Sequence, residues 1–212
     1  MSAFPPRLLR CQRAASAAEF ALVLPLLLLL IFGTIDVGRF MWEVNQAEKA
    51  TQVGARMAIV TTPVSTGLVE ADFAGGTIVA GELIPASALG QLTCTSSKCI
   101  CTTAPCAGIA ETVNSAAFTA IVTRMAQIKP GITSANVEVI YRGSGFGYAG
   151  TAATGTGGGS TPPETMEISP LVTVALTGVQ FTPITSFLLA NITMPSFTTT
   201  LTAEDSAGQY SN

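Results

Sequence analysis

The longest apolar stretch of the chain lies close to its start. Residues 20–35 read FALVLPLLLLLIFGTI, sixteen positions without a charged side chain. As a helix this run is about 24 Å long at 1.5 Å per residue, close to the roughly 30 Å hydrocarbon core of a bilayer. Apolar or small residues then recur at helical spacing as far as residue 58, while Asp36 and Arg39 lie at i,i+3 on the polar side. The pattern predicts one long helix over residues 14–60, with its first half in lipid.

The rest of the chain has the patterns of a small α+β domain. Residues 110–128 have helical spacing, and the Lys-Pro-Gly that follows ends the helix. Alternating apolar and polar positions predict three strands, over residues 137–141, 166–182 and 197–203. Residues 183–190 form a short apolar turn or helix. We expect an α+β fold in which an antiparallel sheet of three or four strands packs on a helix, after the long N-terminal helix.

These patterns divide the chain into three parts. Residues 1–13 form a basic leader, residues 14–60 the long helix, and residues 61–212 the second domain. Within that domain, residues 143–163 are rich in Gly and Thr, which predicts a flexible loop. A phosphate-binding loop would end in Lys-Ser or Lys-Thr, and this stretch does not.

The distribution of charge sets the expected orientation. Arg7, Arg10 and Arg13 precede the apolar run with no acidic residue among them. The positive-inside rule places that end in the cytoplasm and residues 61–212 outside it. A cleaved signal peptide is the alternative, but no small-x-small cleavage site closely follows the run. We therefore expect one retained membrane span.

Composition narrows the classes of function. Of the residues, 11% are charged and 48% are hydrophobic, and the formal net charge is −3. Residues 61–212 hold nine acidic and four basic side chains, which argues against nucleic acid as a partner. The sequence has no histidine, the commonest general base and metal ligand. We expect no catalytic residue, metal or cofactor, and we expect Glu164 and Glu167 to be solvated rather than a catalytic carboxylate pair.

Cysteines form a second recognisable pattern. Four of them lie within thirteen residues, as Cys94, Cys99, Cys101 and Cys106. Outside the cytoplasm this cluster predicts two disulfides in a loop over residues 94–106, whereas Cys11 stands apart before the apolar run. Pairing the two central cysteines would strain a three-residue ring, so an adjacent and a crossed pairing stay open. A zinc site with four thiolates is the alternative, but the usual C-x-x-C spacing is absent.

The long helix carries a composite sequence pattern. Residues 19–25 read EFALVLP, residues 32–40 read FGTIDVGRF, and residues 54–56 read GAR. Together these motifs resemble the TadE-like family, which comprises minor pilins or pseudopilins of the tight-adherence, or Flp-type, pilus apparatus. The resemblance covers residues 13–60 and says little about residues 61–212.

The resemblance implies roles for residues near the start of the helix. In type IV prepilins a membrane peptidase cuts after a glycine, and a glutamate stands fifth in the mature chain. In that register Glu19 is the fifth residue and Ala15 the first, while Ala14 replaces the glycine. Glu19, with Phe20 beside it, would contact a neighbouring subunit, because an unpaired carboxylate in lipid is costly. If Ala14 prevents cleavage, an arginine of the neighbour would replace the amino terminus as partner.

The resemblance also implies a pilin-like architecture and a structural role without catalysis. We expect a single-pass protein of the bacterial inner membrane that supports assembly of a Flp-type pilus through its helix. Its expected partners are the inner membrane, pilus-assembly subunits including the major pilin, and a prepilin peptidase. The alternative is a membrane-anchored extracytoplasmic module that binds another envelope protein or a surface.

Overall fold

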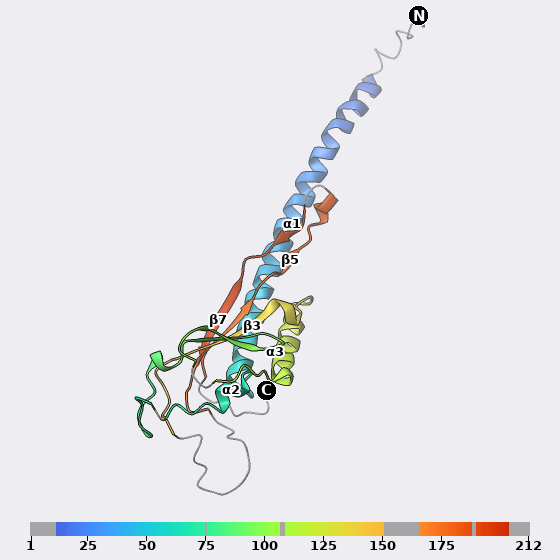
Figure 1. Cartoon of the computed structure of the whole chain (residues 1–212). Helices are drawn as coiled ribbons and strands as arrows, with labels where there is room; N and C mark the ends of the chain where they lie inside the picture. The colour runs from blue at the N-terminus through green and yellow to red at the C-terminus, as the bar shows by residue number, and fades with distance from the viewer. Residues whose placement is uncertain (1–11, 75, 107–108, 151–165, 188–189, 204–212) are drawn as a thin grey trace, which may run out of the picture. The chain divides into compact units, whose positions relative to one another are not determined.

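The longest element of the computed structural model is one continuous helix, α1, Gln12–Val60 (Figure 1). The structure describes residues 12–74, 76–106, 109–150, 166–187 and 190–203. Pro25 lies inside α1 and does not end it. The long helix predicted over residues 14–60 is therefore confirmed.

Contacts divide the chain into two compact units. The anchor unit comprises Met1–Glu43 and Gln180–Ile192, and the sheet unit comprises Val44–Val179 and Thr193–Asn212. Helix α1 contributes to both, because the division falls after Glu43. The three-part division of the sequence stays a prediction.

The sheet unit is built on one antiparallel sheet of five strands. Their spatial order is β2 (Cys99–Thr103), β1 (Gln91–Cys94), β3 (Val137–Arg142), β4 (Leu171–Leu176) and β7 (Phe197–Thr202). The sequence predicted β3, β4 and β7, although it placed β4 inside a longer strand. The cysteine cluster supplies β1 and β2, so the sheet has five strands rather than three or four. The α+β class is confirmed.

Shorter elements complete the described chain. They are α2 (Thr66–Val69), η2 (Ala86–Ala88), α3 (Ser115–Ile128), η3 (Ser134–Asn136), β5 (Gln180–Phe181), η4 (Ile184–Phe187) and β6 (Ile192–Thr193). Helix α3 begins later than predicted because the Asn114 side chain caps it, accepting the Ala117 N–H at 3.1 Å. Strands β5 and β6 pair with each other in a separate small sheet.

The two faces of the large sheet differ in polarity. On β3 and β4, the alternate residues Val139, Tyr141, Val172 and Val174 are buried, as the period of two in a strand requires. The opposite face carries threonines, and the Thr173 and Thr200 hydroxyls are 2.7 Å apart across β4 and β7. The apolar face is covered within the sheet unit by α3 and the C-terminal part of α1.

Small side chains let α1 approach the sheet closely. Its buried residues in the sheet unit include Ala47, Ala50, Gly54, Ala55 and Ala58. A Cβ atom on Gly54 would lie 2.7 Å from the Met125 sulfur on α3 and 3.3 Å from a methyl carbon of Val174 on β4. These distances are shorter than normal contacts, so Gly54 sets the spacing between α1, α3 and the sheet.

The start of the predicted flexible loop is held in place. Ile84 N–H donates to the Gly147 carbonyl at 2.9 Å. The Glu167 carboxylate, 3% exposed, accepts the Phe73 and Gly150 N–H groups, each at 2.9 Å. The expectation that Glu167 is solvated was wrong, because these backbone donors replace water around the buried carboxylate. Glu164 and residues 151–163 lie outside the described residues.

Replacing Gly54 with leucine should destabilise the sheet unit. The larger side chain must displace Met125 or Val174, which costs about 1–3 kcal/mol of the free energy of unfolding. The measurement is thermal or denaturant unfolding of the detergent-extracted protein. Gly38→Leu is the matched control on the same helix, because a Cβ at Gly38 would meet no atom within 4 Å apart from the adjoining backbone of α1. Equal stability of the two variants would show that Gly54 does not set the spacing.

Candidate functional site

The N-terminal part of α1 exposes nearly all of its apolar side chains. In an apolar stretch of 18 residues within α1, only 6% of the residues are buried. Its exposed large side chains include Phe20, Leu22, Val23, Leu26, Leu30 and Ile35. A helix of a soluble core would bury at least one face, so this stretch requires an apolar environment. By length and composition, α1 is a candidate membrane span.

Glu19 and Phe20 lie on this part of α1. Both side chains are exposed, and Phe20 keeps 63% of its surface open. Ala14 and Ala15 belong to the same helix, but the surroundings of their side chains are outside what the structure describes, as is Cys11. Subunit contact through Glu19 and Phe20 and processing between Ala14 and Ala15 therefore stay predictions.

Asp36 follows the apolar run directly and is 7% exposed. Its Oδ1 atom accepts the Ile184 N–H at 2.7 Å. Its Oδ2 atom accepts the Thr185 N–H at 3.0 Å and the Thr185 hydroxyl at 2.8 Å. Both oxygens act as acceptors, as those of an ionised carboxylate do. These bonds attach residues 184 and 185 to α1 across a sequence separation of 148 or more.

The next turn of α1 extends this contact. Arg39 Nη1 lies 3.3 Å from Asp36 Oδ1, and its guanidinium carbon lies 5.5 Å from the Phe181 ring centre. Phe40 meets the same ring edge-on, with 5.4 Å between ring centres. Phe181 is 1% exposed and belongs to β5, which Figure 1 shows beside α1. A charged and an aromatic contact thus hold residues 181–185 against the helix.

The sequence predicted only part of this arrangement. The spacing of Asp36 and Arg39 predicted their pairing, and the ion pair is present. The burial of Asp36 under residues 184 and 185 was missed. An acidic residue immediately after an apolar run was the available signal, because a carboxylate there needs partners. No local pattern identified which distant residues supply them.

Replacing Asp36 with asparagine should loosen the 180–192 segment. The amide offers one acceptor oxygen and turns an N–H₂ group toward donors, leaving at least one of them unpaired at a cost of about 1–3 kcal/mol. Hydrogen exchange measured by mass spectrometry should show the Ile184 and Thr185 amides exchanging about tenfold faster or more. Glu48→Gln, at an exposed position of α1, is the control and should leave the exchange unchanged. Unchanged exchange in Asp36→Asn would contradict the role assigned to this carboxylate.

The cysteine cluster forms the β1–β2 hairpin. Disulfides join Cys94 to Cys99 and Cys101 to Cys106. Cys94 and Cys99 are register partners in the ladder and have no exposed surface, whereas Cys101 is exposed. The adjacent pairing is thus the one present. It replaces the crossed pairing and leaves none of the four thiols free for the alternative zinc site.

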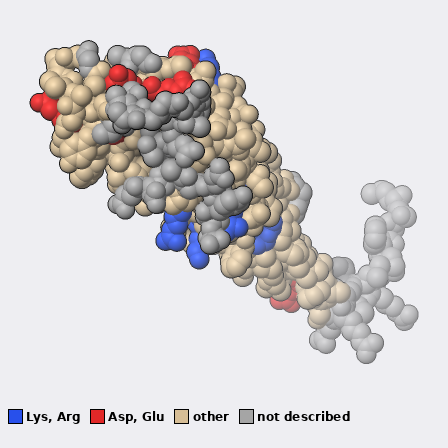
Figure 2. All heavy atoms as spheres, turned by 90° about the horizontal axis from the view of Figure 1, so that it is seen from below, with Lys and Arg blue, Asp and Glu red and all other residues tan. Residues whose placement is uncertain are grey.

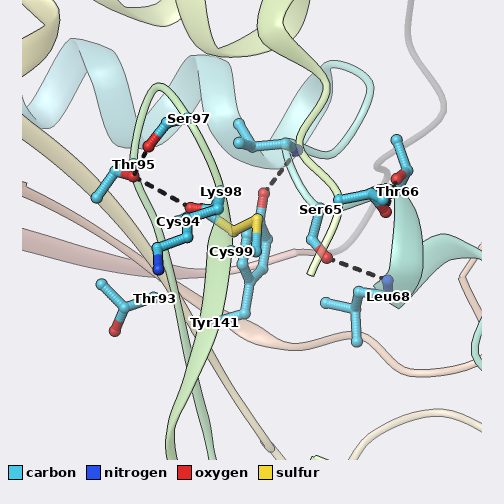
Figure 3. The surroundings of a disulfide bond; sticks show 12 residues. Ser65, Thr66, Leu68, Thr93, Cys94, Thr95, Ser97, Lys98, Cys99 and Tyr141 are labelled. Carbon is cyan, nitrogen blue, oxygen red and sulfur yellow. Dashed lines mark hydrogen bonds between the residues drawn. A yellow bond between two sulfur atoms is a disulfide. The ribbon is translucent and has the colours of Figure 1, made fainter. Parts of the chain in front are cut away.

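Tyr141 lies next to the buried bridge (Figure 3). Its hydroxyl oxygen accepts the Val64 N–H at 2.9 Å, which ties the segment after α1 to β3. Burial raises the pKa of the Tyr141 phenol well above its usual range, so the side chain stays neutral. The hairpin bridge and this tyrosine therefore belong to the core of the sheet unit.

The two disulfides should differ in their reactivity toward a thiol reductant. Attack requires access to a sulfur, so Cys101–Cys106 should be reduced before Cys94–Cys99 in the folded protein. Alkylation after mild reduction, followed by peptide mass spectrometry, identifies which cysteines are modified first. Under denaturing conditions, the control, both bridges should react. Earlier reduction of Cys94–Cys99 in the folded protein would contradict the burial of this bridge.

Charged side chains are sparse on the surface. On the face shown in Figure 2, most described residues are neither acidic nor basic. A groove of about 770 Å³ runs along α3, and Arg124 is the one ionisable side chain among the described residues that line it. Among the described residues, no group of three or more His, Cys, Asp or Glu side chains is placed to hold a metal ion.

Comparison with known proteins relates most of the N-terminal helix to one protein family. Residues 14–56 match the family model described as TadE-like protein. The chain carries a TadE-like segment. The segment contains the exposed apolar part of α1, Asp36, Arg39 and Gly54, and it includes no strand. No match was found among curated proteins or among solved structures. TadE-like proteins are associated with the tight-adherence, or Flp-type, pilus system.

Proposed function

We propose that this chain is a minor pilin or pseudopilin that supports assembly of a tight-adherence pilus. In this proposal α1 anchors the protein in the bacterial inner membrane with its N-terminus in the cytoplasm. The TadE-like segment is the observation that carries the proposal, since it coincides with the exposed apolar part of α1. The partners are other pilus-assembly subunits and the major pilin, with a prepilin peptidase acting where Ala14 permits cleavage.

The exposed apolar surface supports a role in which α1 packs against neighbouring helices. Lipid alone can surround such a helix, but Glu19 makes that arrangement costly. A carboxylate in the hydrocarbon region costs about 2.5–3.5 kcal/mol at the helix centre, and less toward the boundary, where residue 19 would lie. A cation from a neighbouring subunit removes this cost and makes association directional. Glu19 therefore favours pairing with a neighbour, while Phe20 adds apolar contact area.

The proposed role requires no catalysis. TadE-like proteins are not known as enzymes, and packing together with one ion pair is sufficient for joining or supporting subunits. A membrane-anchored binding module is the competing function. It would act through the disulfide-linked hairpin and would tolerate replacement of α1 by an unrelated membrane helix.

Replacing Glu19 should reduce the number of surface pili while the protein level stays normal. Glu19→Gln keeps the size of the side chain and removes its charge, and Glu19→Ala removes both. If pairing with a cation is the role, both variants should lose most pili in a strain that makes them, because the attraction between subunits is lost. The measurement is a count of pili by electron microscopy, with immunoblotting of the membrane fraction.

Glu48→Ala is the matched control, since Glu48 is an exposed glutamate further along α1. It should leave the number of pili unchanged. Normal pili in both Glu19 variants would reject the subunit contact. Normal pili after replacement of the whole TadE-like segment by another membrane helix would favour the binding module.

A further inference from the structure

Two isoleucine side chains of the 180–192 segment are exposed to solvent. Thr185 is 4% exposed and hydrogen-bonded to Asp36, whereas the neighbouring Ile184 is 47% exposed. At the other end of the segment, Ile192 is 45% exposed. The segment contains no charged residue. A segment in water is expected to bury isoleucine and expose threonine, so this arrangement points to an apolar neighbour on the outer side.

Hydrogen bonds fix the position of the segment along α1. Ile184 and Thr185 are bonded to Asp36, which is the first residue after the apolar run of residues 20–35. At 1.5 Å per residue, that run is about 24 Å long and slightly shorter than the roughly 30 Å hydrocarbon core. When the run fills the bilayer, Asp36 and the segment bonded to it must therefore lie at the boundary between acyl chains and headgroups.

Helix α1 continues the apolar surface past Asp36. Val37 is 61% exposed, Met41 is 57% exposed and Trp42 is 66% exposed. Tryptophan is enriched where apolar chains meet headgroups, because its ring is apolar and its N–H needs a polar partner. We call Val37, Met41, Trp42, Ile184 and Ile192 the apolar collar. All five belong to the anchor unit, and they come from two segments that Asp36 joins.

We propose that the apolar collar is a second membrane contact, which lies in the headgroup boundary of the bilayer that α1 spans. The partner of the collar is the lipid surface, because the collar continues the apolar surface of the candidate span. The hydrogen bonds to Asp36 set its depth in the bilayer. The exposed hydroxyls of Thr182 and Ser186 fit this boundary better than the hydrocarbon interior. The inference rests on the proposed anchoring by α1 and adds a contact made by residues near the C-terminus.

Single-tryptophan variants in liposomes test the collar. Trp42→Phe removes the only tryptophan of the chain and provides the background. Tryptophan is then introduced singly at Ile184 and at Ile192 in the collar. Leu28→Trp reports on the apolar run, and Thr119→Trp reports on an exposed position of α3. The probes are phosphatidylcholines brominated either near the headgroup end or near the middle of their acyl chains.

The proposal predicts that both collar variants lose most of their fluorescence with the lipid brominated near the headgroups. They should be affected less by mid-chain bromine, while Leu28→Trp shows the reverse and Thr119→Trp is quenched by neither lipid. Both lipids contain the same total bromine, which controls for non-specific quenching. Intact disulfides and an unchanged circular dichroism spectrum show that each variant is folded.

The remaining outcomes separate this inference from the proposed function. If Leu28→Trp is quenched but both collar variants are not, the collar is rejected and the anchoring stands. If Leu28→Trp is not quenched, the anchoring itself fails. Collar emission that shifts to shorter wavelength with rising protein-to-lipid ratio, without bromine quenching, would assign the collar to a second copy of the chain. Quenching of Thr119→Trp equal to that of the collar would overturn the assigned depth.

Discussion

The anchor unit depends on the hydrogen bonds and the ion pair of the Asp36 carboxylate. It accepts three hydrogen bonds from residues 184 and 185 and pairs with Arg39. Without these donors, a carboxylate directly beside an apolar helix would need water or another cation, and the 180–192 segment would lose its polar attachment to α1. The Phe40–Phe181 contact adds apolar area but cannot by itself fix the position of the segment along the helix, since apolar contacts are not directional.

The same helix serves two different kinds of packing. In the anchor unit it presents large side chains outward, such as Leu22 and Leu26. In the sheet unit it presents small ones inward, and Gly54 meets Met125 and Val174. The TadE-like segment includes both parts, because it extends from residue 14 to residue 56. Its sequence therefore combines a surface suited to lipid or neighbouring helices with a surface that supports the chain's own sheet.

The sequence predicted the elements whose signals are local. An apolar run followed by helical spacing predicted α1, and a strand-like alternation over residues 137–141 predicted β3. The hairpin of β1 and β2 was missed because its cysteines were interpreted only as a loop, although Leu, Thr and Ile alternate with them. Two buried carboxylates were not predicted. The donors to Asp36 and Glu167 are backbone N–H groups of distant residues, and no residue type identifies such groups in a sequence.

The long separation between Asp36 and its donors has a consequence for biosynthesis. During translation, α1 leaves the ribosome well before residues 184 and 185 exist, so the helix must enter its environment with Arg39 as the only one of these protein partners already beside the Asp36 carboxylate. Strands β4 and β7 flank the 180–192 segment in the sequence. Their pairing restricts the positions that the segment can reach before it binds Asp36. A chain that stops before residue 184 would keep the apolar helix and Arg39 but lack the three hydrogen-bond donors to Asp36. The hydrogen bonding of Asp36, near the start of the protein, is thus complete only after the chain has been made as far as residue 185.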